Sequence, residues 1–293
     1  MRHLQIYTAI RAIVQAGSFR KASELLAISP SALNRQIKAL EAEIGEEIFD
    51  RLPQGVRLST VGEMYYRQFS RHLDEIRGVG ETVSEMQGTR IGHVRLRVSP
   101  ELMHGFLQGQ INRFRAAHPK VSFEVRVSAS DRFALALQEG ESDLALILQP
   151  QYRAGVTTLF SEPVALRAVV PNAARPLPVI RNEHFLDHDL ILPPEGSGFR
   201  EFLDVQFKAR LLEVTAGQVT DGLMRPHGAT GRQTLQIWPL VDLEEDWLAQ
   251  RGARAVEVAK LPPARIALCQ QEGRNLPSAA ARFAAQLAEG VQG

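Results

Sequence analysis

The sequence predicts an α+β multidomain protein, in which a winged helix-turn-helix and a long linker helix precede an α/β domain of two lobes. Three observations lead to this fold class. Short helical repeats surround a turn near residue 28, an apolar heptad repeat follows over residues 61–86, and strand and helix patterns alternate after residue 92. We expect these bounds: winged helix-turn-helix 1–58, linker helix 59–87, hinge 88–92, and two-lobed domain 93–293.

Two helices open the chain. The first is expected over residues 3–16, where six apolar side chains recur at helical spacing: Leu4, Ile6, Tyr7, Ile10, Ile13 and Val14. Ser18 can cap the second helix, which should end near Ala27. Ala22, Leu25 and Leu26 then fall on one face, because residues three and four apart lie above one another on a helix.

A third helix is expected from Pro30, after the capping residue Ser29, to Gly45. Proline fits the first helical position and glycine fits the left-handed C-terminal position. The buried stripe of this helix consists of Leu33, Ile37, Leu40 and Ile44. The opposite face is polar and basic, as a helix needs in order to read base edges in the DNA major groove. We therefore expect DNA contacts from Ser29, Pro30, Ser31, Asn34, Arg35 and Lys38.

A two-stranded wing is expected next. The extended runs 48–51 and 56–58 bracket the turn signature Pro53-Gln54-Gly55. Arg51 and Arg57 on this wing are placed to meet phosphate or the minor groove. The alternative is that each arginine is only a solvated surface charge.

The linker helix is expected over residues 59–87. Its apolar positions alternate in steps of three and four: Val61, Tyr65, Phe69, Leu73, Ile76, Val79, Val83 and Met86. Such a stripe is typical of a coiled coil between two chains. The alternative is an amphipathic helix packed only on its own domain, but that domain is too small to cover so long a stripe.

Residues 4–87 resemble the amino-terminal domain of LysR-type transcriptional regulators. The resemblance lies in the run Gly-Ser-Phe-Arg-Lys-Ala-Ser-Glu-Leu-Leu from residue 17, the run Ser-Pro-Ser-Ala-Leu-Asn-Arg-Gln-Ile-Lys-Ala-Leu-Glu from residue 29, and Leu58-Ser59-Thr60-Val61-Gly62-Glu63. Many members carry Gln-Pro where this chain has Pro30-Ser31, so the operator sequence cannot be copied from better-known relatives. The resemblance implies a dimer or tetramer on double-stranded DNA, with RNA polymerase as a further expected partner.

The second half alternates strands and helices, which indicates a parallel sheet wrapped by helices. Strands are expected at 93–99, 121–127, 142–148, 164–170, 189–193, 211–215, 234–238 and 264–269, and helices at 100–117, 132–139, 198–209 and 278–287. The family resemblance implies a carboxy-terminal effector domain like the periplasmic binding proteins. Its first lobe is expected over about 93–163 and 267–293, and its second over about 164–266.

Ligands of open α/β sheets collect at the carboxyl ends of strands, beside helix N-termini. This rule predicts a small-molecule site at Ser99, Pro100, Glu101, Leu102, Ser128, Ser130, Leu148, Gln149, Ser197, Gly198, Phe199, Thr215 and Trp238. For each serine the alternative is a helix cap. Because a carboxylate such as Glu101 is unsuited to an anion site, a cationic, zwitterionic or neutral effector is favoured. Residues 220–238 depart from the family pattern, so the sequence does not define the part of the pocket wall that they form.

Other functions find little support. The formal net charge is +1, so DNA binding must depend on local charge rather than on a global basic field. Because Cys269 is the single cysteine, no intramolecular disulfide can form, which fits a reducing cytoplasm; we expect its side chain in the core. Gly196-Ser197-Gly198 lacks the Gly-x-Ser-x-Gly of a nucleophile elbow, and His184 and His188 lack metal-site surroundings. We expect no enzyme, no cofactor and no membrane segment; the alternatives are a cytoplasmic solute-binding protein and an effector-independent DNA-binding protein.

Overall fold

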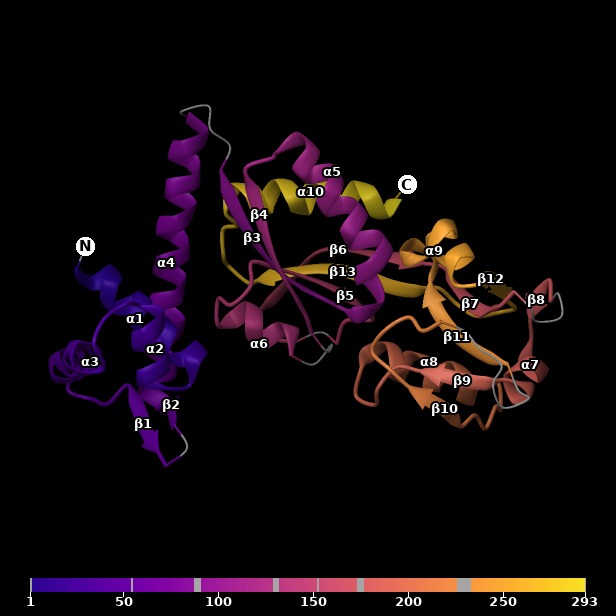
Figure 1. The fold of residues 1–293 in the computed structure, drawn as a ribbon, viewed down its shortest axis with the longest axis horizontal. Coiled ribbons are helices and arrows are strands. Elements are labelled where there is room, and N and C mark those ends of the chain that lie inside the picture. Colours follow the sequence, from indigo (N-terminus) through magenta and orange to yellow (C-terminus); the bar gives the residue numbers. More distant parts are fainter. Residues whose placement is uncertain are drawn as a thin grey trace. The chain divides into compact units, whose positions relative to one another are not determined.

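The computed structural model describes residues 2–53, 55–86, 91–128, 132–151, 153–172, 177–225 and 233–292. The chain forms two compact units, the first built on Met1–Gln87 and the second on the chain from Gly88 onward (Figure 1). The expected hinge at 88–92 falls largely outside the described residues, which resume at Ile91. Within the described parts of the chain, no helix has the length and apolar character needed to cross a membrane.

The first unit contains the predicted helices and wing. Their bounds are α1 Arg2–Ala16, α2 Phe19–Leu25, α3 Pro30–Ile44, β1 Phe49–Leu52, β2 Gly55–Leu58 and α4 Thr60–Met86. The strands β1 and β2 pair antiparallel, with Asp50 opposite Arg57. The core is formed by the inward faces of the helices, including Ile10, Leu33 and Ile37.

The two halves of α4 differ in what covers their apolar residues. In the first half, Tyr66 and Phe69 are buried in the core of the unit, and Phe69 stacks on Tyr7 with ring centres 4.0 Å apart. In the second half, Ile76, Val79 and Val83 are 49, 64 and 47% exposed. Among the described side chains, the second half of α4 therefore carries a run of uncovered apolar residues, whereas the first half has both buried residues and the exposed Met64 and Tyr65.

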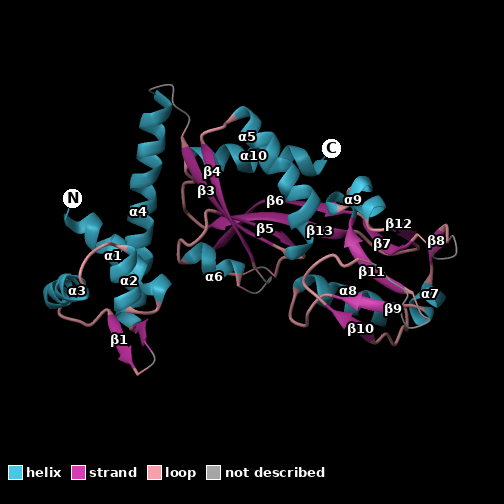
Figure 2. Cartoon of the chain, viewed as in Figure 1, coloured by secondary structure: helices cyan, strands magenta, loops and turns pink. Residues whose placement is uncertain are grey.

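The first lobe of the second unit has a five-stranded sheet in the order β4-β3-β5-β13-β6. Its strands are β3 Gly92–Val98, β4 Val121–Val127, β5 Leu144–Leu148, β6 Val156–Val164 and β13 Ala264–Gln271. The first three are parallel, as predicted, and β13 runs antiparallel to β5 and β6. Helices α5 Gln108–Ala117 and α10 Ser278–Gln292 lie on one side of the sheet, and α6 Phe133–Gln138 lies on the other (Figures 1 and 2).

The second lobe has a six-stranded sheet in the order β10-β9-β11-β7-β12-β8. Its elements are β7 Leu166–Pro171, β8 Val179–Ile180, α7 Asn182–Asp187, β9 Asp189–Leu192, α8 Gly198–Ala209, β10 Ala216–Val219, β11 Thr234–Pro239, the short 3-10 turn η3 Leu240–Asp242, α9 Glu245–Gln250 and β12 Ala253–Val258. The chain therefore passes between the two sheets twice, at Ala165 and within residues 259–263.

A buried charge network holds the first lobe together. Asp143 is fully buried and accepts hydrogen bonds from Arg95 Nη2 at 2.8 Å and from Arg274 Nη2 at 2.9 Å. It also accepts from the backbone N–H of Arg95 at 2.9 Å. Because β3, β5 and the segment before α10 meet at this carboxylate, the network joins the beginning of the lobe to the end of the chain.

Two strand predictions were wrong. Residues 164–170 do not form one strand: β6 ends at Val164 in the first sheet and β7 begins at Leu166 in the second. Residues 211–215 are not a strand either, since the N–H groups of Leu211 and Leu212 bond to carbonyl groups at the end of α8 and Leu211 has a left-handed φ of 57°. The strand follows at β10 instead. The strand β12 was not predicted, although burial alternates over its last four residues, from Ala255 to Val258.

The helix predicted over 100–117 is divided. A 3-10 turn, η1 Pro100–Leu102, and a π-helical turn, η2 Met103–Leu107, precede α5. The backbone N–H groups of Gly105 and Phe106 donate to Asp242 Oδ1 at 2.9 and 3.0 Å. Asp242 belongs to the second lobe, so this irregular turn is fixed by a residue that lies far away in the sequence.

Candidate DNA-binding face and ligand cavity

The N-terminus of α3 carries the predicted DNA-facing residues. Ser29 caps the helix, since its Oγ accepts a hydrogen bond from the N–H of Ala32 at 3.2 Å. Pro30 occupies the first helical position, and Gly45 ends the helix with a φ of 84°. The side chains of Ser29, Pro30, Ser31, Arg35 and Lys38 are exposed, and that of Asn34 is half-buried. The structure therefore brings all six predicted residues of this helix to one accessible face.

The wing meets this face through Arg51. Its Nη2 donates to Asn34 Oδ1 at 2.6 Å, and its guanidinium lies 5.4 Å from the centre of the Phe19 ring. Phe19 in turn packs edge-on against Phe49, at 5.6 Å between ring centres. Arg51 is thus held by contacts from α2 and α3, and a held side chain loses less freedom on binding.

Arg57 lies on the other strand of the wing and has a different environment. Its Nε donates to Asp50 Oδ2 at 3.1 Å, and the two side chains are 69 and 40% exposed. An exposed ion pair of this kind contributes little to stability. Asp50 nevertheless offsets part of the charge of Arg57, which the sequence pattern did not indicate.

The second unit contains a cavity of about 360 Å³ between its two lobes. The first lobe contributes Ser99, Pro100, Glu101, Val127, Ser128, Arg132 and Leu148. The second lobe contributes Pro194, Glu195, Gly196, Ser197, Phe199 and Asp221. Seven of the predicted effector residues are in this lining: Ser99, Pro100, Glu101, Ser128, Leu148, Ser197 and Phe199.

Five predicted residues lie outside the lining. Leu102 and Trp238 are core residues, 0 and 1% exposed, and the indole N–H of Trp238 donates to Asp242 at 3.1 Å. Gly198 is buried in the first turn of α8, Gln149 turns away after β5 with a φ of 52°, and Thr215 is exposed before β10. Ser130 lies outside the described residues.

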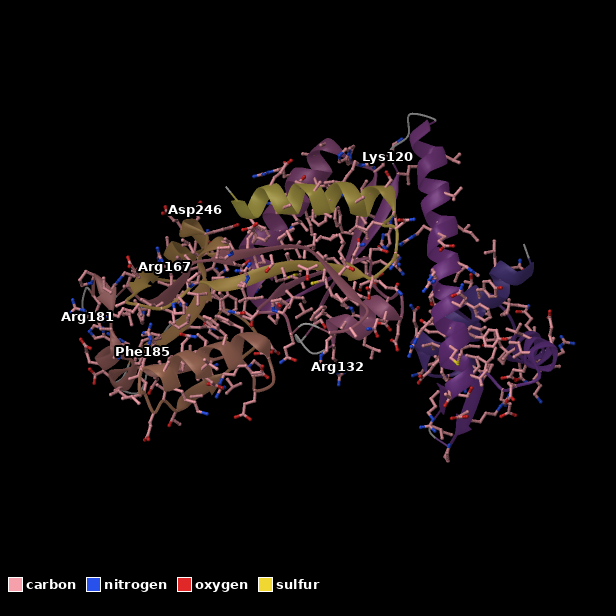
Figure 3. The ribbon with its side chains drawn as sticks, turned by 180° about the vertical axis from the view of Figure 1, so that it is seen from behind. Lys120, Arg132, Arg167, Arg181, Phe185 and Asp246 are labelled. Atoms are coloured by element: carbon pink, nitrogen blue, oxygen red, sulfur yellow. The ribbon has the colours of Figure 1, made fainter. Side chains whose placement is uncertain are left out.

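Six lining residues were missed by the strand-end rule: Val127, Arg132, Pro194, Glu195, Gly196 and Asp221. Val127 is the last residue of β4, so the rule could have found it. Arg132, labelled in Figure 3, comes from the segment before α6. Asp221 lies in the stretch after β10 that departs from the family pattern, where the sequence offers no element to place it.

Glu101 is the buried carboxyl group of the cavity lining, with a residue exposure of 4%. The pKa of Glu101 is raised from 4.5 to about 7, mainly by burial and to a smaller extent by the nearby carboxyl groups of Asp221 and Asp242. Its own backbone N–H acts in the opposite direction. A carboxyl group in this environment is poised between its neutral and charged forms near neutral pH.

Asp242 is buried as well, but it is fully engaged. Burial raises the pKa of Asp242 to about 6, although hydrogen bonds from Trp238, Phe106 and Gly105 lower it. A Cβ atom on Gly105 would lie 2.5 Å from the backbone oxygen of Asp242, so only glycine fits there. Asp242 thereby joins η3 of the second lobe to η2 of the first.

Cys269 lies in β13 and is 1% exposed, as expected of a core residue. Burial raises the pKa of its thiol, which disfavours the reactive thiolate. Within the described ranges, no group of three or more His, Cys, Asp and Glu side chains is arranged to hold a metal ion.

The sequence matches two family descriptions. Residues 3–63 match "Bacterial regulatory helix-turn-helix protein, lysR family", and residues 87–292 match "LysR substrate binding domain". The chain is 25% identical over 221 residues to the HTH-type transcriptional regulator YdcI of Escherichia coli K12, covering 74% of this chain and 71% of that one. It is also 25% identical over 222 residues to a probable nitrogen assimilation transcriptional activator of Synechococcus elongatus, with the same coverage.

Solved structures share the fold over the whole length. A full-length OxyR variant from Pseudomonas aeruginosa has a TM-score of 0.71 at 21% identity, covering 99% of this chain and 97% of that one. Full-length CbnR complexed with its target DNA has a TM-score of 0.62 at 15% identity, covering 98% and 99%. With the helix-turn-helix, the two-lobed domain and both family matches in agreement, the chain belongs to the LysR family of transcriptional regulators.

Proposed function

We propose that α3 reads operator DNA in the major groove, with the wing on the flanking backbone. Members of this family are DNA-binding regulators rather than enzymes, and the proposal concerns which residues make the contacts. The observation that supports it is the accessible polar face of Ser31, Arg35 and Lys38 on a capped helix. Arg51, held against Asn34, adds a positive charge beside that face.

A salt-dependent DNA-binding titration on the upstream intergenic sequence tests this proposal, with a scrambled duplex beside it. Specific binding should exceed non-specific binding by at least ~1,000-fold and weaken as salt rises. Arg35→Ala should reduce the affinity about 10- to 100-fold, because a well-placed side chain on a base contributes about 1–3 kcal/mol. Arg113→Ala, an exposed arginine on α5 of the other unit, is the matched control. Equal losses in both variants would remove Arg35 from the interface.

The second half of α4 supports a homodimer. Ile76, Val79 and Val83 follow one another at helical spacing and stay about half exposed or more, and a partner helix would cover them. Val79→Asp should shift the protein to monomers in sedimentation experiments. Gly78→Asp, on the same helix but outside the stripe, should leave the mass unchanged. The family also forms tetramers, and the mass measured in the same sedimentation experiments distinguishes a dimer from a tetramer.

The cavity between the lobes is the proposed effector site. It has residues from both lobes in its lining, so a ligand that contacts both favours one lobe arrangement over another. Only such a difference in affinity can change the DNA-bound geometry. Metabolites screened on the protein–DNA complex should alter its stability, and this separates an effector-controlled regulator from an effector-independent one. Because it acts on DNA, we propose that the protein works in the cytoplasm, with RNA polymerase as a further partner.

A further inference from the structure

Three buried carboxyl groups of the second unit have different partners. Asp143 is paired with Arg95 and Arg274, and Asp242 accepts three N–H hydrogen bonds. Glu101 lines the cavity at 4% exposure and has no cationic side chain bonded to it among the residues that the structure describes. Buried charges in proteins are normally paired, so a carboxylate at this position lacks the partner that its burial calls for.

The surroundings of Glu101 do not supply that positive charge. Asp221 and Asp242 lie close enough to disfavour its ionisation. Glu195 and Asp221 are exposed members of the cavity lining, so they add negative charge on the solvent side. Arg132 is the basic member of the described lining, and it too is exposed. The lining thus carries three carboxyl groups and one guanidinium, with the most buried position acidic.

We propose that the cavity binds a small organic molecule through an ammonium or guanidinium group, which Glu101 holds as its buried counter-ion. This inference rests on the proposed effector site and specifies the chemistry of its ligand. Asp221, from the other lobe, supplies a second carboxylate for the cationic group. It lines the same cavity and lies near enough to Glu101 to raise the pKa of Glu101. The hydroxyl oxygens of Ser99 and Ser197 accept hydrogen bonds from backbone N–H groups. Each hydroxyl can therefore still donate a hydrogen bond to an acceptor atom of the ligand.

Two other classes of ligand fit less well. A divalent metal ion needs several converging carboxylates, and no metal-binding group of three or more side chains occurs within the described ranges. A dicarboxylate would place negative charge against Glu101 and Asp221, which disfavours its binding. The volume of about 360 Å³ is near the lower end of ligand pockets, roughly 300–1,000 Å³, and therefore indicates a small molecule.

Binding of a cation should be linked to proton release. Glu101 faces Asp221 and Asp242, with His104 near Asp242 and with Glu195 and Arg132 in the same lining. An ammonium group favours the ionised carboxylate, so the affinity should rise with pH until the free protein has lost the Glu101 proton. The cationic class and its pH dependence are thereby tested in the same experiment.

The test is calorimetry on the full-length protein with probes of matched chain length: diaminoalkanes, ω-amino acids and α,ω-dicarboxylates, together with arginine and agmatine. At least one amine or guanidine should bind, and the dicarboxylates should not. Glu101→Gln should weaken that binding about 10- to 100-fold, as expected for loss of a hydrogen bond to a charged group. Val127→Trp places a bulky uncharged group at an exposed lining position and should abolish binding. Urea unfolding of each variant, followed by the fluorescence of Trp238 and Trp247 in the same unit, checks that this unit is folded.

The outcomes separate this inference from the proposed effector site. Binding of dicarboxylates that Val127→Trp blocks and Glu101→Gln leaves unchanged keeps the site but overturns its cationic class. Binding that Val127→Trp leaves unchanged places the ligand elsewhere and overturns both proposals. Failure of every amine and guanidine to bind also overturns the inference, whatever the DNA titration shows.

Discussion

The polar face of α3 comes from the single segment between Ser29 and Lys38, whereas the cavity lining comes from segments spread between Ser99 and Asp221. On α3 the helical period alone decides which side chains face outward, so the surface exists as soon as the helix packs. In the cavity, the residues of one lobe meet those of the other only when both sheets have formed. The two regions should therefore respond to different mutations.

The largest effect is expected in the unit that contains the cavity. Asp143→Ala leaves Arg95 and Arg274 buried without their counter-ion, which should lower the free energy of unfolding by about 3–5 kcal/mol. Both tryptophans, Trp238 and Trp247, lie in this unit, so their fluorescence during urea unfolding reports on it. Asp204→Ala, which removes a more exposed ion pair, should change the free energy of unfolding by less than about 1 kcal/mol. A small effect of Asp143→Ala would show that the network does not hold the lobe together.

The next effect has the opposite sign and depends on pH. Glu101 has a pKa raised from 4.5 to about 7, so the unfolded chain releases this proton at lower pH than the folded one. Stability is therefore lost as pH rises from about 4.5 through about 7, and Glu101→Gln should avoid this loss. The free energy of unfolding of the variant should exceed that of the unmodified protein by about 2–3 kcal/mol at pH 8, and the two should be equal at pH 4. Glu195→Gln, at an exposed position, should change little at either pH; a gain independent of pH would contradict burial of the charge.

In the first unit the most sensitive position is Gly62. A Cβ atom there would lie 2.0 Å from the backbone oxygen of Ile48, so Gly62→Ala must separate α4 from the segment before the wing. The free energy of unfolding of the first unit should fall by about 1–3 kcal/mol, as measured by circular dichroism. Operator binding should weaken as well. Tryptophan fluorescence and ligand binding in the other unit should stay the same. Gly78→Ala, where a methyl group meets nothing within 4 Å, should be neutral or stabilising by about 0.5–1 kcal/mol.

The smallest expected effects compare two helix caps of the same chemistry. Ser29 accepts from Ala32 N at 3.2 Å, and Ser197 accepts from Arg200 N at 3.1 Å. Each serine-to-alanine change should cost about 1 kcal/mol of stability. Ser29→Ala should weaken operator binding and spare the ligand, while Ser197→Ala should do the reverse. If both variants lose both activities equally, the two regions are not independent.

The first unit was largely predictable in its helices and its wing. On α3, the Ser29 cap, the glycine C-terminus and the apolar stripe are local signals, and each appears where the sequence indicates. On α2 the prediction was wrong in two respects, since Ser18 makes no side-chain cap hydrogen bond and Leu25 is 72% exposed. What was missed there, the contacts of Arg51 with Asn34 and of Arg57 with Asp50, depends on how the wing folds back.

The second half was predictable in its strands but not in its crossings. The strand β4 begins and ends where the alternation of apolar and polar residues does, at Val121 and Val127. The division of residues 156–171 between two sheets was missed, since each strand by itself could belong to either sheet. The rule for strand ends found Ser99, Glu101 and Ser128, but it also selected Trp238, whose ring turns into the core.

The sequence by itself determined the family and the outer face of α3, because both depend on residue types and spacing within short local segments. The tertiary structure alone decided that Glu101 is buried beside Asp221 and Asp242, residues more than a hundred positions later in the chain. Burial and the approach of like charges arise only when distant segments meet. The environment that sets the chemistry of the cavity is therefore a property of the fold.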